Sequence, residues 1–166
     1  MKNGLVIADA GPIFSLAIID KLEILNSLFD EIKIPNAVWE EITLKKNTEY
    51  YKEIKSFFEL KVVKISSFNE LTFIMDYGES ESLILYKELN AQFLLIDDKK
   101  ARTIAENFNI ECIGTLGLLS IAKSKGLLDN LRPLFVKFIQ SNRYYSIKLL
   151  NKLLENHKEQ KITYKA

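Results

Sequence analysis

Apolar residues recur along the chain in two patterns, as short runs and as longer stretches at helical spacing. The short runs predict five strands, at 5–8, 31–34, 60–65, 93–96 and 111–113. Apolar positions three or four residues apart predict helices at 13–19, 22–29, 36–43, 49–58, 79–89, 99–108, 116–123, 131–139 and 147–154, and a helical turn at 71–75. Strands that alternate with helices are typical of a parallel sheet covered on both faces. We therefore predict an α/β fold, a parallel α/β sandwich with five short strands.

The pattern shows no internal repeat, linker or shift in composition, which predicts one domain over residues 1–156. The tail at 157–166 is expected to fray and to leave His157 at the surface. Cys112 is the one cysteine, which excludes an internal disulfide framework and suits a reducing cytoplasm. No apolar run approaches the roughly 20 residues of a membrane span, so we expect no membrane partner. The net charge of +1 is far from that of a strongly basic nucleic-acid protein, so any such binding needs a local patch.

Acidic residues follow two of the predicted strands directly. Asp9 follows the run at 5–8, and the pair Asp97-Asp98 follows the run at 93–96. Because parallel strands joined by right-handed crossovers end at the same edge of a sheet, we expect these residues to share that edge, where α/β proteins bind ligands. Each also has a simpler structural interpretation, as a turn residue or as a helix cap.

Two further acidic pairs stand near helix starts. Glu40-Glu41 lies in the helix after the second strand, and Glu79 and Glu81 open the helix that follows Gly78. Residues two apart on a helix point about 200° away from each other, so Glu79 and Glu81 cannot share one direction. Taken alone, such residues often complement the helix dipole or face solvent. Several carboxylates gathered without basic partners raise each other's pKa, and a divalent cation relieves that repulsion.

Carboxylate oxygens without histidine or cysteine favour Mg²⁺ or Mn²⁺ over zinc. Two such ions held by carboxylates suit phosphodiester cleavage, which then needs no nucleophilic side chain. Beside the paired aspartates, Lys99, Lys100 and Arg102 are candidates for binding RNA phosphates. The segment at 143–145, Arg-Tyr-Tyr, combines charge with stacking surface, as single-strand binders do.

Four motifs together resemble those of PIN-domain proteins, most closely an uncharacterised prokaryotic branch. They are Ile7-Ala8-Asp9-Ala10-Gly11-Pro12, Ile34-Pro35-Asn36-Ala37-Val38-Trp39-Glu40-Glu41-Ile42, Gly78-Glu79-Ser80-Glu81 and Leu95-Ile96-Asp97-Asp98-Lys99-Lys100-Ala101-Arg102. The resemblance implies a three-layer α/β/α sandwich with a central, mostly parallel sheet of about five strands, and a metal-dependent ribonuclease with a site of acidic residues. The positions carried over for catalysis and metal binding are Asp9, Glu41, Glu81 or Glu79, and Asp97 or Asp98. Many relatives are toxins that a small antitoxin protein neutralises, and many form homodimers, so RNA, an antitoxin and a second copy are the expected partners.

Other functions remain to be separated from this one. A catalytically weak PIN-like module that binds RNA or a protein would share the same motifs. A phosphatase of the haloacid-dehalogenase type needs a second Asp two residues after the first, where this chain has Gly11. A dinucleotide-binding protein needs a glycine-rich turn after the first strand, which the sequence from Asp9 to Pro12 lacks.

Overall fold

The computed structural model describes residues 2–163, built around a parallel sheet in the order β3-β2-β1-β4-β5. The strands are β1 (Leu5–Ala8), β2 (Glu31–Pro35), β3 (Val62–Val63), β4 (Phe93–Leu95) and β5 (Cys112–Ile113). In the centre, β1 pairs with β2 through Val6 opposite Ile32 and with β4 through Ile7 opposite Leu94. The chain therefore moves outward from β1 in both directions, so the switch point of the sheet lies between β1 and β4, where open α/β sheets bind ligands.

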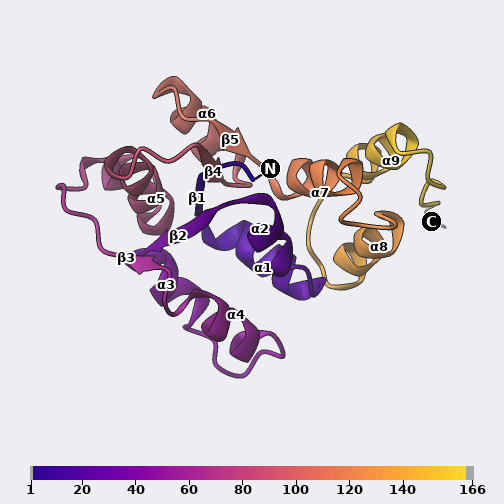
Figure 1. The fold of residues 1–166 in the computed structure, drawn as a ribbon, viewed down its shortest axis with the longest axis horizontal. Helices are drawn as coiled ribbons and strands as arrows, with labels where there is room; N and C mark the ends of the chain where they lie inside the picture. Colours follow the sequence, from indigo (N-terminus) through magenta and orange to yellow (C-terminus); the bar gives the residue numbers. More distant parts are fainter. Residues whose placement is uncertain (1, 164–166) are drawn as a thin grey trace.

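Helices cover both faces of this sheet (Figure 1). They are α1 (Ala10–Ile18), α2 (Glu23–Leu28), α3 (Asn36–Ile42), α4 (Tyr51–Phe58), α5 (Tyr77–Glu88), α6 (Lys99–Asn107), α7 (Thr115–Ser124), α8 (Arg132–Gln140) and α9 (Ile147–Asn156), with a 3₁₀ turn, η1, at Glu70–Phe73. One face of β1 presents Val6 and Ala8 to the core formed with α1, α2 and α7. The other presents Ile7 to a second core, formed with α5 and α6. Burial on both faces explains the uninterrupted apolar runs and confirms the predicted three-layer α/β/α fold.

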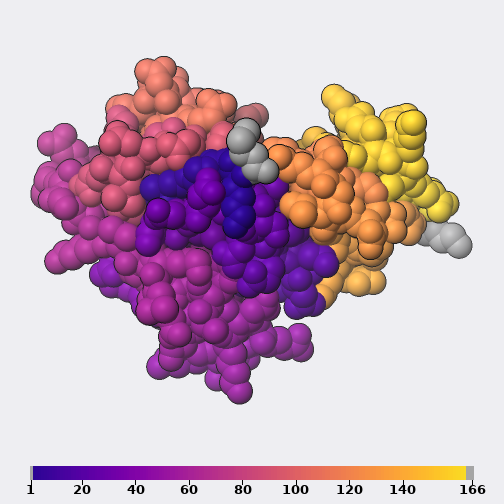
Figure 2. Space-filling view, viewed as in Figure 1, coloured from indigo at the N-terminus to yellow at the C-terminus, as the bar shows by residue number. Residues whose placement is uncertain are grey.

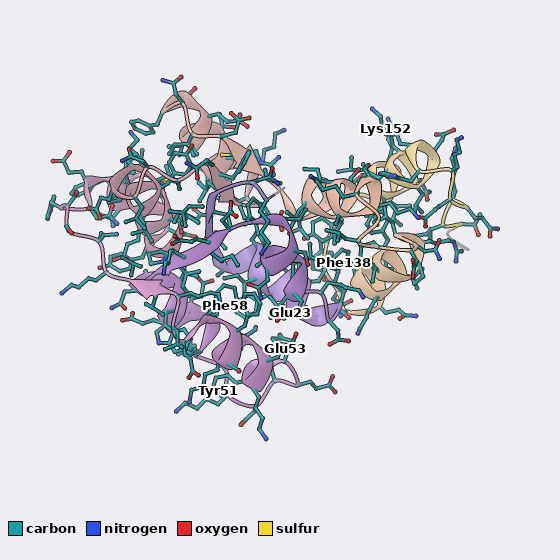
Figure 3. All side chains as sticks on the ribbon, viewed as in Figure 1. Glu23, Tyr51, Glu53, Phe58, Phe138 and Lys152 are labelled. Atoms are coloured by element: carbon teal, nitrogen blue, oxygen red, sulfur yellow. The ribbon has the colours of Figure 1, made fainter. Side chains whose placement is uncertain are left out.

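The larger core extends from α4 across α1 to the three C-terminal helices. Figure 3 labels Phe58 on α4 and Phe138 on α8, which lie on opposite sides of α1, and both side chains are fully buried. Phe138 also packs against the ring of Tyr145, with 5.0 Å between the ring centres. Through this contact the core of the C-terminal helices reaches a residue that lies beside the candidate site.

Several element boundaries differ from the pattern-based prediction, and a local feature accompanies three of these differences. Helix α1 begins at Ala10 rather than residue 13, so Pro12 lies in its first turn. Backbone N–H groups in a first helical turn have no acceptor within the helix, so a proline there, which has no N–H, removes no hydrogen bond. Helix α5 begins at Tyr77, with Asp76 at its N-cap position. Strand β3 is only two residues long, since Pro35 at the end of β2 has no N–H to continue the pairing.

The tail beyond α9 is held against the domain, at least as far as residue 163, which contradicts the predicted fraying. Glu159 accepts hydrogen bonds from the backbone amides of Leu131 and Arg132 at the start of α8, at 2.8–3.0 Å. His157, expected at the surface, is half-buried, with Nε2 2.7 Å from the hydroxyl of Ser120. The predicted tail residues after 163 lie outside the described part of the chain.

Within residues 2–163, none of the helices has the length and apolar character that crossing a membrane requires.

Candidate functional site

Asp9 occupies the switch point of the sheet. It ends β1, its backbone N–H donates to the carbonyl of Leu95 on β4 at 2.9 Å, and it stands at the N-cap position of α1. The residue is only 7% exposed, and its side chain makes no capping hydrogen bond. Loss of hydration on burial is the largest of the effects that raise the pKa of Asp9 to about 7, and the nearby charges of Glu79, Glu41 and Asp97 add to it. The site thus centres on a buried carboxylate that other acids approach.

Glu41 on α3 and Glu79 on α5 are two of these approaching acids, and Gly78 lies beside both Glu41 and Asp9. A β-carbon on Gly78 would stand 3.0 Å from Oε2 of Glu41 and 3.7 Å from Oδ1 of Asp9. The absence of a side chain at this position therefore leaves open the space between these two carboxylates. Partial burial is the main cause that raises the pKa of Glu41 and of Glu79, followed by the charge of Asp76 for Glu41 and of Asp98 for Glu79.

Glu79 is held by the start of its own helix. It stands three residues after Asp76, the N-cap residue of α5, and a backbone hydrogen bond at Asp76 acts against the rise of its pKa. This is the spacing of a capping box, in which the third helical residue reaches back to the cap. The charge of Glu79 raises the pKa of Asp9, and the charge of Asp98 raises the pKa of Glu79, so these side chains lie near one another.

Asp97, after β4, accepts three hydrogen bonds. Its Oδ1 accepts from the backbone amide of Thr115 at 2.7 Å, and its Oδ2 accepts from the Thr115 hydroxyl at 2.7 Å and from the Tyr145 hydroxyl at 2.8 Å. Thr115 is the first residue of α7, so the carboxylate joins the end of β4 to that helix. These bonds fix the orientation of Asp97 beside Asp9.

A chain of hydrogen bonds continues from Asp97 to the loop before α9. Tyr145 contacts the hydroxyl of Ser15 at 2.7 Å, and the guanidinium of Arg143 donates to that same hydroxyl and to the carbonyl of Gly11 at 2.8–3.1 Å. Burial, followed by the charge of Asp97, raises the pKa of Tyr145 to about 12, so the phenol keeps its proton and donates. Of the predicted stacking segment, Arg143 and Tyr145 are thus part of the support of the site, and Tyr144 alone is fully exposed.

Asp98 and the three predicted phosphate-binding residues begin α6. Oδ1 of Asp98 accepts from the amide of Ala101 at 2.8 Å, so this residue caps the helix. Lys99 and Lys100 are exposed to solvent. Arg102 instead turns inward, where it donates to the carbonyl of Ile96 at 2.9 Å and contacts Gly114. The structure therefore leaves the two lysines, rather than Arg102, available to a ligand.

Glu81 lies on the other side of α5 and does not join the group around Asp9. It is 6% exposed, and its Oε2 accepts from the backbone amide of Ala37 at 2.9 Å, at the start of α3. Glu40 lines the same pocket as Glu81. The structure thus separates each predicted pair: Glu41 and Glu79 face Asp9, whereas Glu40 and Glu81 face away.

The acids around Asp9 form no ion pair with a basic side chain in the described structure. The three ion pairs between side chains of residues 2–163 join Lys123 to Glu159, Lys137 to Asp20 and Lys161 to Glu155, all elsewhere. Across the same residues, no three carboxylate, histidine or cysteine side chains already stand close enough to hold an ion as a group. The site therefore offers carboxylate oxygens whose charge no ion pair balances, and these oxygens are not yet arranged closely enough to coordinate one ion together.

Replacing Tyr145 with phenylalanine is expected to lower the free energy of unfolding by about 1–3 kcal/mol. The change removes a partner from both Asp97 and Ser15, while the ring still packs against Phe138. Urea unfolding of the two proteins measures the difference. Tyr144→Phe is the matched control, because that side chain is 95% exposed, and an equal effect of both variants would contradict the role given to Tyr145.

Sequence patterns alone did not identify Asp76, Thr115, Ser15 or Tyr145 as parts of the site. For Asp76 a usable signal exists, since the run Asp76-Tyr77-Gly78-Glu79 has the spacing of a capping box. The contacts of Ser15 and Tyr145 span 130 positions, and no local pattern signals such a pairing.

Comparison with known proteins adds one match that covers nearly the whole chain. A family model described as "DUF3368: PIN domain" matches residues 5–159, which include the five strands and all the acids described above. No curated protein matches the sequence. Among solved structures, the chain is similar to a domain of a functionally unknown protein from Methanocaldococcus jannaschii DSM 2661. The two are 22% identical, with a TM-score of 0.43, over 66% of this chain and 89% of the other.

Proposed function

Because the chain belongs to the PIN-domain family DUF3368, we propose that it is a metal-dependent endoribonuclease that hydrolyses phosphodiester bonds of RNA. PIN domains are commonly nucleases. The observation that carries the proposal is Asp9, a buried carboxylate at the switch point of the sheet, with Glu41, Glu79 and Asp97 nearby and no basic partner among the described residues. Ionising it in the folded protein is costly unless a cation compensates the charge.

The residues present fit Mg²⁺ or Mn²⁺ by their chemistry. They are hard carboxylate oxygens, and the space beside Gly78 separates two of them, Glu41 and Asp9. Asp9, Glu41 and Glu79 would hold the ion, with Asp98 across the same pocket from Glu79. A bound divalent cation would lower the pKa of the attacking water and neutralise charge on the scissile phosphate.

The remaining groups of the site bind and orient. Lys99 and Lys100, exposed at the start of α6, would attract the phosphates that flank the scissile bond. Asp97 is held by Thr115 and Tyr145, so it contributes a fixed negative charge beside Asp9. Glu81 would have no part in the reaction and would stabilise the start of α3.

We extend the proposal to biological context on the strength of the resemblance to toxin relatives. The chain would act in the cytoplasm, as a homodimeric toxin of a toxin–antitoxin pair, and a small antitoxin protein would block the acidic site. Its single, half-buried cysteine suits that compartment.

The test of the function is the cleavage of end-labelled single-stranded RNA by the purified chain with Mg²⁺ or Mn²⁺, and with EDTA as the blank. We expect Glu79→Gln to lower the rate at least about tenfold, because it removes one metal-binding charge. Glu81→Gln should cleave like the wild type, and its loss of stability should stay within about 1 kcal/mol.

The matched control for charge removal is Glu53→Gln. Glu53 on α4 lines a surface pocket with Glu23, and both are labelled in Figure 3. Glu53 also lines a pocket with Ala17 and Ile18 at the C-terminal end of α1, whereas Asp9 stands at the N-terminal end of that helix. Burial, followed by the charges of Asp20 and Glu23, raises the pKa of Glu53. The pKa of Glu79 is raised by the same kinds of effect, so the two glutamates are comparable apart from their position. A loss of cleavage in Glu81→Gln or Glu53→Gln as large as in Glu79→Gln would contradict the assignment.

A second function, RNA or protein binding without efficient cleavage, is favoured by one observation. Asp97 already accepts three hydrogen bonds, which leaves it few lone pairs for an ion. Under this alternative, RNA binds without any metal-dependent product, and Glu79→Gln changes nothing in the cleavage assay.

A further inference from the structure

Three exposed aromatic side chains belong to the segment between β3 and α5 and to the first residue of α5. This segment forms the left-hand margin of the molecule in Figure 2. Phe68 is 82% exposed, Phe73 is 86% exposed and Tyr77 is 60% exposed. We call these three residues the aromatic ridge. Large apolar side chains that stand together in solvent mark binding surfaces more often than chance, because exposing them has a cost.

The aromatic ridge stands between two pockets, and Thr72 lines both. On one side, Phe73 lines a pocket of about 430 Å³ together with Lys100 and the candidate metal ligand Glu79. On the other side, Phe68 and Tyr77 line a pocket together with Lys64. Each pocket thus combines an aromatic surface with a lysine, and one of them opens onto the acidic site.

The backbone under the ridge is anchored. The carboxylate of Glu88 on α5 accepts from the amides of Ser66 and Ser67 at 2.7–3.1 Å. The side chain of Asn69 donates to the hydroxyl of Ser80 at 2.8 Å. The aromatic side chains are therefore presented on a fixed base, and a ligand that stacks on them loses little free energy in ordering the segment.

We propose that the aromatic ridge binds the bases of single-stranded RNA and leads the strand to the acidic site. The proposal rests on the proposed nuclease function and specifies its substrate class. Bases stack on exposed aromatic rings whatever their identity, whereas the bases of a duplex are already stacked on one another. Lys64 and Lys100, one in each pocket, supply the positive charge that the flanking phosphates require.

Position favours RNA over a protein partner as the occupant. Glu79 lines the same pocket as Phe73 and Lys100, so a phosphodiester bound at Glu79 would lie beside the aromatic ridge. The pocket holds three carboxylates, those of Asp76, Glu79 and Asp98, and one lysine among its described lining residues. An apolar partner seated there would bury more negative than positive charge, which is unfavourable.

The test measures binding apart from cleavage, by fluorescence anisotropy of short labelled RNA in the Asp9→Asn background with Mg²⁺. Adding Phe73→Ala should weaken binding of the single strand at least about fivefold, and Phe68→Ala should act in the same direction. A fully paired hairpin should bind more weakly than the single strand and should not respond to Phe73→Ala. Leu60→Ala is the control, since Leu60 is 90% exposed but lines neither pocket, and it should leave the affinity unchanged.

Unchanged single-strand affinity in both aromatic variants would overturn the proposal, as would an equal loss for the hairpin. A change of oligomeric mass in Phe73→Ala, with RNA binding intact, would assign the ridge to contact between copies of the chain and would also overturn it. Failure here is distinct from failure of the nuclease function. If RNA binding depends on Phe73 but the wild type does not cleave RNA, only the proposed nuclease function is rejected. If the wild type cleaves RNA with metal but Phe73→Ala does not change RNA binding, only the proposed role of the aromatic ridge is rejected.

Discussion

Replacing Asp9 with asparagine is expected to lower the rate of metal-dependent RNA cleavage at least about a hundredfold, the largest loss of any single change at the site. Asp9 is the carboxylate that Glu41, Glu79 and Asp97 all approach, and it lies at the switch point between β1 and β4. Asparagine keeps the shape of the side chain and removes its charge, so the affinity for a divalent ion falls while the fold persists. Initial rates on end-labelled single-stranded RNA, over a range of Mn²⁺ concentrations, measure the loss.

The control for this variant is Glu53→Gln, which removes a charge from an acidic surface region away from Asp9. If Asp9→Asn cleaves RNA at the wild-type rate, the acidic group is not the catalytic centre. If a high Mn²⁺ concentration restores the cleavage rate of Asp9→Asn, the variant is slow because it binds the metal ion more weakly.

The same variant should be more stable than the wild type in alkaline, metal-free buffer, by up to about 4 kcal/mol. In the folded protein the pKa of Asp9 is about 7, whereas that of an unperturbed aspartate is 3.8. The folded state therefore binds more protons than the unfolded chain between these two values, and the free energy of unfolding falls as the pH rises through this window. The asparagine side chain of the variant cannot ionise, so the variant should show no such fall from this position.

Urea unfolding in EDTA, at about pH 4 and about pH 8, tests this expectation. The two proteins should differ little at the lower pH, where the wild-type carboxyl is neutral, and should separate at the higher pH. Added Mn²⁺ should then stabilise the wild type more than the variant, because an ion that binds the folded state raises the free energy of unfolding. If the wild type and Asp9→Asn have equal free energies of unfolding at both pH values, the charge of Asp9 is compensated without a metal.

The placement of Asp9 and Asp97 at one edge of the sheet was predictable, because each residue directly follows a short apolar run that predicts a buried strand. The backbone of Asp9 bonds to that of Leu95, two positions before Asp97, as the parallel-strand rule requires. The choice between Glu79 and Glu81 was not predictable from helical geometry, which only states that the two diverge. It depends on where α5 begins and on α3 packing against it, which supplies the amide of Ala37 to Glu81.

The support of Asp97 shows a further limit of local patterns. Thr115 lies on the next strand-to-helix turn, and Tyr145 comes from the loop before the last helix. The sequence around Tyr145 indicates only an aromatic, basic segment, which equally favoured stacking on RNA. Burial decided its role, since the ring packs on Phe138 and the hydroxyl bonds to Ser15 and Asp97.

The central position of β1 has a consequence for synthesis on the ribosome. Of the strands of this sheet, β1 is translated first and pairs on one side with β2, but its other side stays open until β4 has been translated, when Ala8 meets Leu95. Until then the nascent chain carries an unpaired, fully apolar strand edge, which is prone to pair with other chains. A prematurely terminated product that lacks β4 would also carry Asp9 without Asp97 and Asp98, so incomplete chains of this protein should be inert.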